Sequence, residues 1–585
     1  MPKITVDGRE IEVAAGATII VAIDQLGVAV PRYCYHPRLP IAGNCRMCLV
    51  EVEKMPKLVT SCTTPVTEGM VVHTTSPRVK ESQANVLEFL LLNHPLDCPI
   101  CDKAGECDLQ NQYFQFSARD SRLDVDEKVH KPKAVDLGER IVLDAERCVL
   151  CTRCIRFMEV VAHDPVLGIR ERADRSELTI FPGKRLDSRY SINTTDVCPV
   201  GALTSKEFRF RKRVWFLKHT KSVCPNCATG CPVMLDHEDG KIYRMMPGTR
   251  DGVETWLCDP GRLGFTHVNE AQRPKMPVMQ SMEARGTQVI SSWPDALARV
   301  AAGFREHADA NSSKVGAIIS NWHTNEEIYA FIKLMKAFGA SHIALHDPKT
   351  GLVDSGPADD ILIRDDKNPN TRGAREITGG IKNAVKPLAE LLDACIAGKI
   401  KALYVCDPDL VARVSDPKDK KRVADALKKV KFLVVQSPIQ SDLTRSAHVH
   451  LASATFAEKE GTFTNGDGVV QKVRRAFKLA GEILPDLEIF VRLADALGQP
   501  LGFKTPGQAM AALAAEVKVF ADVKWNDLDV TPGRVGYGKL TNATPDAHKL
   551  GPFPAAAPAP APAPSPASQS SPAATPPVKP VEAAR

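Results

Sequence analysis

The sequence predicts a multidomain protein in which small mixed α+β units precede an α/β domain and a structureless tail. Its 585 residues exceed the ~150 expected of one domain. Only two of the 17 cysteines, Cys395 and Cys406, lie after Cys258, so the other 15 fall in the first 258 residues. From about residue 286 the cysteine-rich sequence gives way to alternating strand-like and helix-like runs, which is typical of an α/β sheet domain.

The composition is that of an ordinary globular protein, with 44% hydrophobic and 25% charged residues. A net charge of +6 is small for this length and argues against a dedicated nucleic-acid binder. The stretch Met1–Val6 has no apolar core of a signal peptide, and no run approaches the ~18 apolar residues of a membrane span. We therefore expect a cytoplasmic chain without direct membrane insertion, in which thiols stay reduced.

Residues 1–80 predict a hairpin, a helix and a cysteine-bearing loop. Asp7-Gly8 separates two alternating apolar–polar runs within residues 3–13, which indicates a β-hairpin, and residues 17–26 predict a short helix. Two strand-like runs follow, Leu49–Val52 and Leu58–Thr60. This order predicts a β-grasp ferredoxin domain holding a 2Fe–2S cluster, with a zinc-bound loop as the alternative. Its candidate ligands are Cys34, Cys45, Cys48 and Cys62.

Residues 81–120 predict an apolar-faced helix over 81–93 followed by a loop with three cysteines, Cys98, Cys101 and Cys107. Three cysteines need a fourth ligand to close a 4Fe–4S site, and His94 stands four residues before the first of them. Imidazole is a known iron–sulfur ligand. The alternative is that His94 caps the last carbonyl groups of the helix.

Residues 121–216 contain the most specific motif, Cys148-Val-Leu-Cys-Thr-Arg-Cys154. Cysteines at positions 148, 151 and 154 have the spacing with which ferredoxins hold three corners of a 4Fe–4S cube, and a remote Cys-Pro such as Cys198-Pro199 supplies the fourth. Zinc sites more often pair two arms of two ligands each. A strand-like run, Leu178–Phe181, lies between the ligands.

The run Arg209–Phe216 interleaves basic and aromatic residues. Such a pattern is compatible with single-stranded nucleic acid. Because no second basic region accompanies it, we expect instead an alternating strand with a solvated basic face.

Residues 217–275 contain a fourth set of cysteines, with two strand-like runs, Val233–Leu235 and Lys241–Met245, around Asp239-Gly240. The spacing of two and then three residues with a remote fourth cysteine predicts a four-thiolate pocket for a 4Fe–4S cluster, and a zinc ribbon is the alternative. The candidate ligands are Cys224, Cys227, Cys231 and Cys258.

Residues 276–503 predict a parallel α/β sheet without a P-loop or a G-x-G-x-x-G motif. The expected elements are strands over Val315–Ile319, Ile361–Ile363, Ala402–Val405 and Phe432–Val435 and a helix over Asn325–Phe338. Cys395 falls in a helix-like run, Leu391–Ile396. Cys406 ends a strand, where such sheets place ligands, although a small core hydrophobe is its commoner role.

Residues 504–553 form a C-terminal extension, and residues 554–585 are rich in proline, alanine and serine. Such a composition buries no core, so we expect an extended, disordered tail.

These four ligand sets, in this order, resemble the large iron–sulfur subunit of respiratory complex I (NADH-quinone oxidoreductase), also known as its G-type or 75-kDa subunit. The resemblance covers about residues 1–500. It implies that the four sets hold one 2Fe–2S and three 4Fe–4S clusters, the last matching an off-path cluster of some bacterial members. All sixteen residues quoted above fall on the family's ligand positions.

Two further stretches, Asn368–Ala374 and Ala454–Asn465, resemble the molybdopterin-oxidoreductase domain. In complex I this domain is a relic without metal, and here it looks shortened. The family's usual Ala-Asp-Val-Val-Leu-Pro-like run is replaced by Ala447-His-Val-His-Leu-Ala452. No cysteine stands in the place of a molybdenum ligand, so no molybdenum is expected.

The resemblance implies an electron carrier that has no substrate-binding or catalytic residue of its own. Electrons would come from NADH through FMN on a partner subunit and go toward quinone, with proton translocation elsewhere in the complex. The implied partners are the FMN/NADH-binding subunit, a 2Fe–2S subunit and a subunit with two 4Fe–4S clusters, at the cytoplasmic face of the inner membrane. The alternative is an iron–sulfur subunit of an NAD-linked formate dehydrogenase or hydrogenase.

Overall fold

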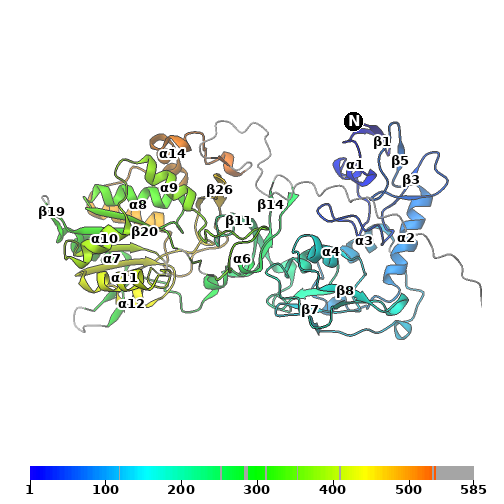
Figure 1. Ribbon diagram of the computed structural model, residues 1–585, viewed down its shortest axis with the longest axis horizontal. Helices are drawn as coiled ribbons and strands as arrows, with labels where there is room; N and C mark the ends of the chain where they lie inside the picture. The colour runs from blue at the N-terminus through cyan, green and yellow to red at the C-terminus, as the bar shows by residue number, and fades with distance from the viewer. Residues whose placement is uncertain are drawn as a thin grey trace, which may run out of the picture. The chain divides into compact units, whose positions relative to one another are not determined.

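The computed structural model of the chain is drawn in Figure 1. It describes residues 1–117, 119–250, 253–281, 287–309, 312–348, 350–351, 353–407, 410–414, 416–529 and 533–534. They belong to one compact unit, Met1–Thr544, and the tail expected from residue 554 lies outside the described residues. No helix among the described residues has the length and apolar character needed to cross a membrane.

A five-stranded sheet and one helix form the N-terminal domain. Its elements are β1 (Lys3–Val6), β2 (Arg9–Glu12), α1 (Ile19–Gln25), β3 (Leu49–Val52), β4 (Val59–Thr60) and β5 (Val71–His73). The strand order is β2-β1-β5-β3-β4, with β1 antiparallel to β2 and parallel to β5. Asp7 and Gly8 have φ angles of 45° and 78°, which make the tight hairpin turn. The buried face of α1 packs on the sheet, which confirms the predicted β-grasp fold.

The second segment is mainly helical. It contains α2 (Pro77–Leu91), η1 (Cys98–Ile100), α3 (Asp108–Phe116) and η2 (Val125–Glu127). Helix α2 begins before the expected residue 81 because Ser76 caps it, accepting a hydrogen bond from the Val79 N–H at 3.3 Å, and Pro77 occupies its first turn. Gln83 ties α2 to the N-terminal sheet by donating to the Leu49 carbonyl at 3.0 Å.

The third segment is built on short strands. Its elements are β6 (Val135–Asp136), β7 (Ile141–Leu143), α4 (Arg153–Val160), β8 (Leu167–Arg170), η3 (Ala173–Arg175), β9 (Glu177–Ile180), α5 (Asn193–Val197), β10 (Leu203–Ser205) and η4 (Val214–Phe216). Strands β10, β7 and β6 form one antiparallel sheet, and β8 pairs with β9. The strand expected over Leu178–Phe181 is therefore present as β9.

The strand expected over Arg209–Phe216 is wrong, because this run forms turns and the short helix η4. Phe210 has a left-handed φ of 60°, which breaks an extended strand. Its N–H donates to Asp102 at 3.1 Å, and Arg213 donates to the Cys101 carbonyl at 2.6 Å. The basic residue Arg213 thus binds the neighbouring cysteine loop.

The fourth segment is a three-stranded antiparallel sheet with a short helix. It comprises β11 (Lys218–Val223), β12 (Pro232–Glu238), β13 (Lys241–Pro247), β14 (Thr249–Arg250), β15 (Val253–Glu254), α6 (Asp259–Arg262) and η5 (Thr266–Asn269). Strand β12 is central, between β11 and β13. The predicted hairpin is present, with φ angles of 48° at Asp239 and 73° at Gly240.

The remaining described residues form the α/β domain. Its first elements are β16 (Val278–Gln280), β17 (Gln288–Ile290), α7 (Trp293–Arg305), β18 (Ala308–Asp309), β19 (Ser312–Ser313), β20 (Val315–Ser320), α8 (Asn325–Ala337), β21 (His342–His346), α9 (Thr371–Gly380), α10 (Leu388–Ile396) and β22 (Ala402–Cys406). The later ones are α11 (Pro417–Lys429), β23 (Phe432–Ser437), α12 (Asp442–Ser446), β24 (Val449–Ala452), β25 (Gly461–Thr464), β26 (Val469–Val473), α13 (Asp486–Leu497), α14 (Pro506–Glu516), η6 (Lys518–Phe520), η7 (Asp527–Asp529) and β27 (Gly533–Arg534).

The main sheet of this domain has the order β17-β16-β24-β23-β22-β20-β21, and its last five strands are parallel. Helices α7, α8, α13 and α14 pack on one face, and α10, α11 and α12 pack on the other. The predicted α/β class is confirmed. From β20 the chain moves to β21 on one side and then returns to β22 on the other, so the strand order reverses between β20 and β22.

The strand expected over Ile361–Ile363 is also wrong. The backbone N–H groups of Leu362 and Ile363 both donate to one carboxylate oxygen of Asp359 at 2.9 Å. The Asp359 carboxylate therefore accepts the backbone N–H groups that a neighbouring strand would otherwise accept, and the run forms a bend instead of a strand.

Candidate metal centres

The sixteen side chains expected to bind metal form four separate groups in the structure. We call them the first, second, third and fourth centre, in chain order. Each has its own ligands and surrounding groups, and hydrogen bonds join neighbouring centres.

The first centre comprises Cys34, Cys45, Cys48 and Cys62. The Cys34 sulfur contacts those of Cys45 and Cys62, and the Cys48 sulfur contacts that of Cys62. The Cys34 N–H also donates to the Cys45 sulfur at 3.4 Å. Contact with Cys62 lowers the pKa of the Cys48 thiol to about 6, whereas contact with Cys34 raises the pKa of Cys62. The four sulfurs thus face one another closely enough to bind a common cationic group.

The second centre comprises His94, Cys98, Cys101 and Cys107. His94, Cys98 and Cys107 line one cavity, and Cys101 lies against Gly201, where any Cβ would overlap its sulfur. Burial lowers the pKa of His94 to about 4, so its imidazole is neutral at physiological pH, as a metal ligand must be. Its Nδ1 atom is buried and has no hydrogen-bond partner among the described residues.

The alternative role of His94, a cap for the helix carbonyls, is taken by another residue. The ammonium group of Lys128 donates to the carbonyl oxygens of Leu91 at 3.2 Å and Leu92 at 2.6 Å. These are the terminal acceptors that a capping side chain would satisfy. The imidazole is therefore left to line the cavity.

The third centre comprises Cys148, Cys151, Cys154 and Cys198, which line one cavity with apolar residues such as Leu178 and Leu203. Leu150 and Thr152 have left-handed φ angles of 52° and 60°, and the Leu150 N–H donates to the Cys148 sulfur at 3.4 Å. Burial and then the neighbouring thiols raise the pKa of Cys148 to about 12 and that of Cys151 to about 11. Four thiolates are therefore stable together only with compensating positive charge.

The fourth centre comprises Cys224, Cys227, Cys231 and Cys258, which also line one cavity. Burial, followed by the other three cysteines, raises the pKa of Cys224 well above its ordinary value. The Gly261 N–H donates to the Cys258 sulfur at 3.3 Å. A Cβ on Gly261 would lie 2.9 Å from that sulfur and 3.3 Å from the sulfur of Cys224. The backbone at Gly261 thus lies close against the sulfurs of Cys258 and Cys224, where only glycine leaves enough room.

Direct hydrogen bonds join these centres. Arg156 donates to the Cys34 carbonyl at 2.6 Å and to the Cys151 carbonyl at 3.1 Å, which links the first and third centres. The Asp108 N–H donates to the Pro199 carbonyl at 3.0 Å and links the second and third. Asn193 exchanges two hydrogen bonds with the Leu257 backbone, at 2.7 and 3.1 Å, next to Cys258 of the fourth centre.

Several buried groups around the centres were not predicted from the sequence. Arg153 donates to the Tyr35 carbonyl at 2.7 Å beside the first centre, and Arg147 pairs with Asp97 near Cys101. Tyr33 is fully buried, and its pKa is raised by burial and then by Cys107, Asp108 and Cys45, so it lies between the first and second centres. The only sequence signal for this set was the presence of arginines within and beside the cysteine motif at 148–154.

Four groups of cysteine and histidine side chains, most of them buried and lying together on ferredoxin-type folds, define an iron–sulfur protein of several centres. Comparison with protein-family profiles makes this class more specific. The matches are to the 2Fe-2S iron-sulfur cluster binding domain (residues 2–77), the NADH-ubiquinone oxidoreductase-G iron-sulfur binding region (83–122), the ferredoxin-like domain of NADH-quinone oxidoreductase subunit 3 (138–204), the molybdopterin oxidoreductase Fe4S4 domain (217–270) and molybdopterin oxidoreductase (370–496). The predicted 2Fe–2S and 4Fe–4S cofactors are thereby confirmed.

Curated relatives confirm the resemblance to the G-type subunit of NADH-quinone oxidoreductase. The protein of that name from Streptomyces coelicolor is 42% identical over 336 residues, which are 57% of this chain and 39% of that one. The one from Rickettsia felis is 39% identical over 347 residues, 59% of this chain and 50% of that one. The one from Mycobacterium tuberculosis is 40% identical over 340 residues, 57% and 42%. The matches thus span half or less of the length of these curated relatives.

Among solved structures, a chain from the crystal structure of an NAD+-reducing [NiFe]-hydrogenase in the H2-reduced state is 28% identical to this chain. The likeness covers 36% of this chain and 91% of that chain, with a TM-score of 0.34.

Proposed function

We propose that this chain is an iron–sulfur electron-transfer subunit in the peripheral arm of an NADH-quinone oxidoreductase, an enzyme of the translocase class. NADH and FMN would bind on one partner subunit, and other iron–sulfur subunits would lead to quinone, while proton translocation would occur elsewhere in the complex. The observation that carries the proposal is the succession of four ligand groups joined by direct hydrogen bonds. The names of the relatives at about 40% identity support it.

The ligand assignment within this proposal follows the four centres. The first would hold a 2Fe–2S cluster through Cys34, Cys45, Cys48 and Cys62. The other three would hold 4Fe–4S clusters through His94, Cys98, Cys101 and Cys107, through Cys148, Cys151, Cys154 and Cys198, and through Cys224, Cys227, Cys231 and Cys258. Such clusters, when bound, supply reversible one-electron oxidation and reduction.

The chain's own residues hold and insulate these groups rather than carry out acid–base or nucleophilic chemistry. Most of the thiols are buried away from water, and backbone N–H groups such as those of Leu150 and Gly261 donate to the sulfurs. The cations Arg147, Arg153 and Arg156 offset negative charge that accumulates near the thiolates. These are the means by which a protein sets cluster potentials.

An exposed apolar surface near the second centre supports docking of another subunit. Leu96 and Phe114 are 65% and 70% exposed and line the same cavity as His94, Cys98 and Cys107, and Cys98 is itself exposed. Exposed apolar residues gathered at a cofactor site are typical of a protein interface. We place the chain, through such partners, peripherally at the cytoplasmic face of the inner membrane.

The test is to purify the tagged full chain from membranes and to identify the chains that accompany it. We expect an FMN/NADH-binding subunit, a 2Fe–2S subunit and a subunit with two 4Fe–4S clusters, together with NADH-driven quinone reduction. The chain separated from these partners should contain about 14 iron atoms. Stoichiometric molybdenum or tungsten with formate oxidation, or nickel with hydrogen oxidation, would overturn the proposal in favour of an NAD-linked formate dehydrogenase or hydrogenase.

A further inference from the structure

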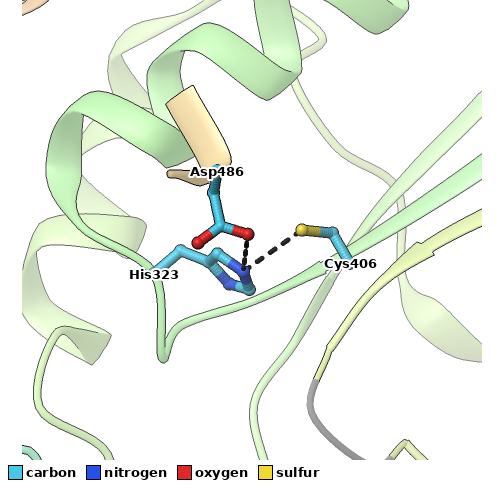
Figure 2. Close-up of side chains that lie close together, drawn as sticks. All are labelled: His323, Cys406 and Asp486. Carbon is cyan, nitrogen blue, oxygen red and sulfur yellow. Dashed lines mark hydrogen bonds and ion pairs between the residues drawn. The ribbon is translucent and has the colours of Figure 1, made fainter. Parts of the chain in front are cut away.

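A second kind of metal-ligating group lies in the α/β domain, outside the four centres. The side chains of His323, Cys406 and Asp486 present one nitrogen, one sulfur and one oxygen atom that all lie within 4.8 Å of one another. Figure 2 shows the three pointing toward a common point from separate elements. All three are buried, with 6%, 0% and 1% exposure.

The topology of the sheet places this group where doubly wound sheets bind ligands. His323 follows the carboxyl end of β20, and Cys406 is the last residue of β22. These are the two parallel strands between which the strand order reverses, and ligands bind outside the carboxyl ends of strands at such a point. Asp486 enters from the first residue of α13. The placement and the donor set are independent observations that point to a bound ligand.

The geometry at His323 distinguishes a metal site from a catalytic relay. Both partners face the same ring nitrogen, with the Cys406 sulfur at 3.1 Å and an Asp486 oxygen at 3.8 Å from Nε2. The other nitrogen, Nδ1, lies 3.0 Å from the Ser320 carbonyl, an acceptor that fixes its proton there and leaves the Nε2 lone pair toward the group. A nucleophile–base–acid relay would instead place the carboxylate on Nδ1.

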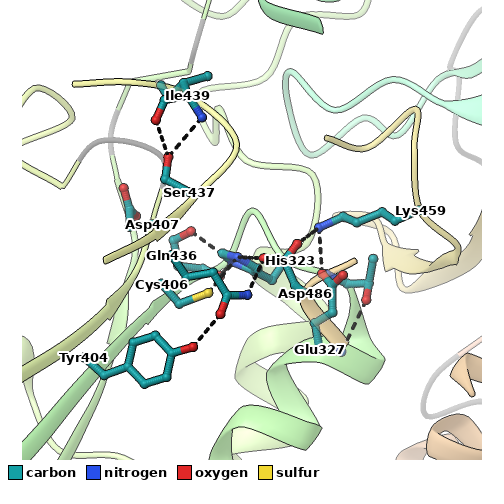
Figure 3. Close-up of polar contacts among 12 residues, drawn as sticks. His323, Glu327, Tyr404, Cys406, Asp407, Gln436, Ser437, Ile439, Lys459 and Asp486 are labelled. Carbon is teal, nitrogen blue, oxygen red and sulfur yellow. Dashed lines mark hydrogen bonds and ion pairs between the residues drawn. The ribbon is translucent and has the colours of Figure 1, made fainter. Parts of the chain in front are cut away.

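A shell of buried polar residues orients these ligands. Gln436 donates to Asp486 Oδ1 at 2.6 Å and is itself held by the Tyr404 hydroxyl. Lys459 lies between Asp486 and Glu327, at 2.7 and 2.9 Å from their oxygens (Figure 3). Each carboxylate oxygen retains a further lone pair for a cation. Holding ligand orientation through such outer hydrogen bonds is a feature of protein metal sites.

We propose that His323, Cys406 and Asp486 bind one Zn2+ ion, with a water molecule as the fourth ligand. A thiolate, an imidazole and a carboxylate are the three ligand types that zinc takes, and tetrahedral bonds to them would separate the donor atoms by about 3.3 to 3.6 Å. The two separations from His323 Nε2, 3.1 Å to the sulfur and 3.8 Å to the oxygen, lie on either side of this range. Binding releases the Cys406 proton to solvent. The ion would connect the loop after β20, the end of β22 and the start of α13.

The test uses the purified full chain with zinc and iron measured separately. We expect about one zinc per chain, at least tenfold less in Cys406→Ala and in His323→Ala, and unchanged zinc in Cys395→Ala. Cys395 is the matched control because it is a buried cysteine of the same domain that packs on the opposite face of the sheet. Iron content that is equal in all four proteins would show that the variants fold.

Zinc X-ray absorption of the unaltered protein tests the proposal even if both variants misfold. We expect about one sulfur neighbour at about 2.3 Å and nitrogen or oxygen neighbours at about 2.0–2.1 Å. Absence of zinc, a shell of four sulfurs indicating zinc in the cysteine centres, or equal zinc in Cys406→Ala and Cys395→Ala would each overturn it.

Discussion

The cysteine centres and the His323–Cys406–Asp486 group are assembled in opposite ways. In the third centre three ligands lie within residues 148–154, and the backbone between them already turns the sulfurs inward through left-handed residues. In the α/β domain, His323 and Cys406 are separated by 83 residues and meet only because two parallel strands pair. A local loop can bind metal before the fold is complete, because closing a short loop costs little entropy. The His323–Cys406–Asp486 group, in contrast, exists only after the sheet has formed.

The largest effect that would test this comparison is loss of a local ligand. In Cys154→Ala the third centre should lose its cluster, so that iron falls by about four atoms per copy of the chain and NADH-driven electron transfer in the complex stops. Iron analysis and EPR spectroscopy check this. Cys395→Ala is the control and should change neither iron content nor electron transfer. Burial is the cause that raises the pKa of the Cys395 thiol, with no contribution from any of the four centres. Equal iron in the two variants would contradict the assignment.

A smaller effect is expected where the backbone, rather than a ligand, shapes a centre. A Cβ at Gly201 would overlap the Cys101 sulfur, so Gly201→Ala should destabilise the protein by about 1–3 kcal/mol and reduce occupancy of the second centre. Thermal unfolding and iron content measure this. Gly379→Ala is the control, because a Cβ there meets nothing within 4 Å and favours helix α9. If both variants retain full iron, close packing at Gly201 is unimportant.

A change of ligand type at His94 should alter a potential without losing the centre. His94→Cys replaces a neutral imidazole by a thiolate, so the reduction potential of the second centre should fall. Potentiometric EPR measures the shift, and His130→Ala, at an exposed imidazole, is the control. His94→Ala with an unchanged signal and potential would show that the imidazole is not a ligand.

The last effect concerns stability alone, without loss of any centre, and lies in the α/β domain. Burial raises the pKa of Glu326 to about 7 from 4.5, so the folded state holds a proton that the unfolded state releases between these values. Stability should therefore fall by up to about 3 kcal/mol as pH rises from 4.5 to 7 and should level off above it. Glu326→Gln should remove this dependence and leave iron unchanged. The measurement is the free energy of unfolding of both proteins at pH 5 and pH 8. An equal change between the two pH values in both proteins would contradict the prediction.

Most of the fold could be predicted from the sequence because it depends on short-range patterns, and the structure brings together the cysteines that were grouped by their spacing. Hairpins at Asp7-Gly8 and Asp239-Gly240 and the strand ending at Cys406 are local signals, and the structure contains them. Arg209–Phe216 was mispredicted because alternation alone does not provide a neighbouring strand to pair with. Burial of Cys406 was anticipated, but not its contact with His323.

Long-range partners account for what could not be predicted. Lys128 reaches the end of α2 across 37 residues, and Arg156 reaches Cys34 across 122. No spacing rule connects such positions, because their approach depends on how the domains pack. The sequence could not show that Lys128, rather than His94, binds the carbonyl groups at the end of α2.

The contact of Gly201 with Cys101 bears on how this protein can be divided or recombined. A fragment ending near residue 120 would contain every proposed ligand of the second centre but would lack Gly201 and Pro199, which lie against that centre from a later part of the chain. The side chains of the second centre and the backbone that encloses them thus come from different stretches of the sequence. The second centre is portable only together with the third, so a shuffling event or a fusion design must treat the two as one unit.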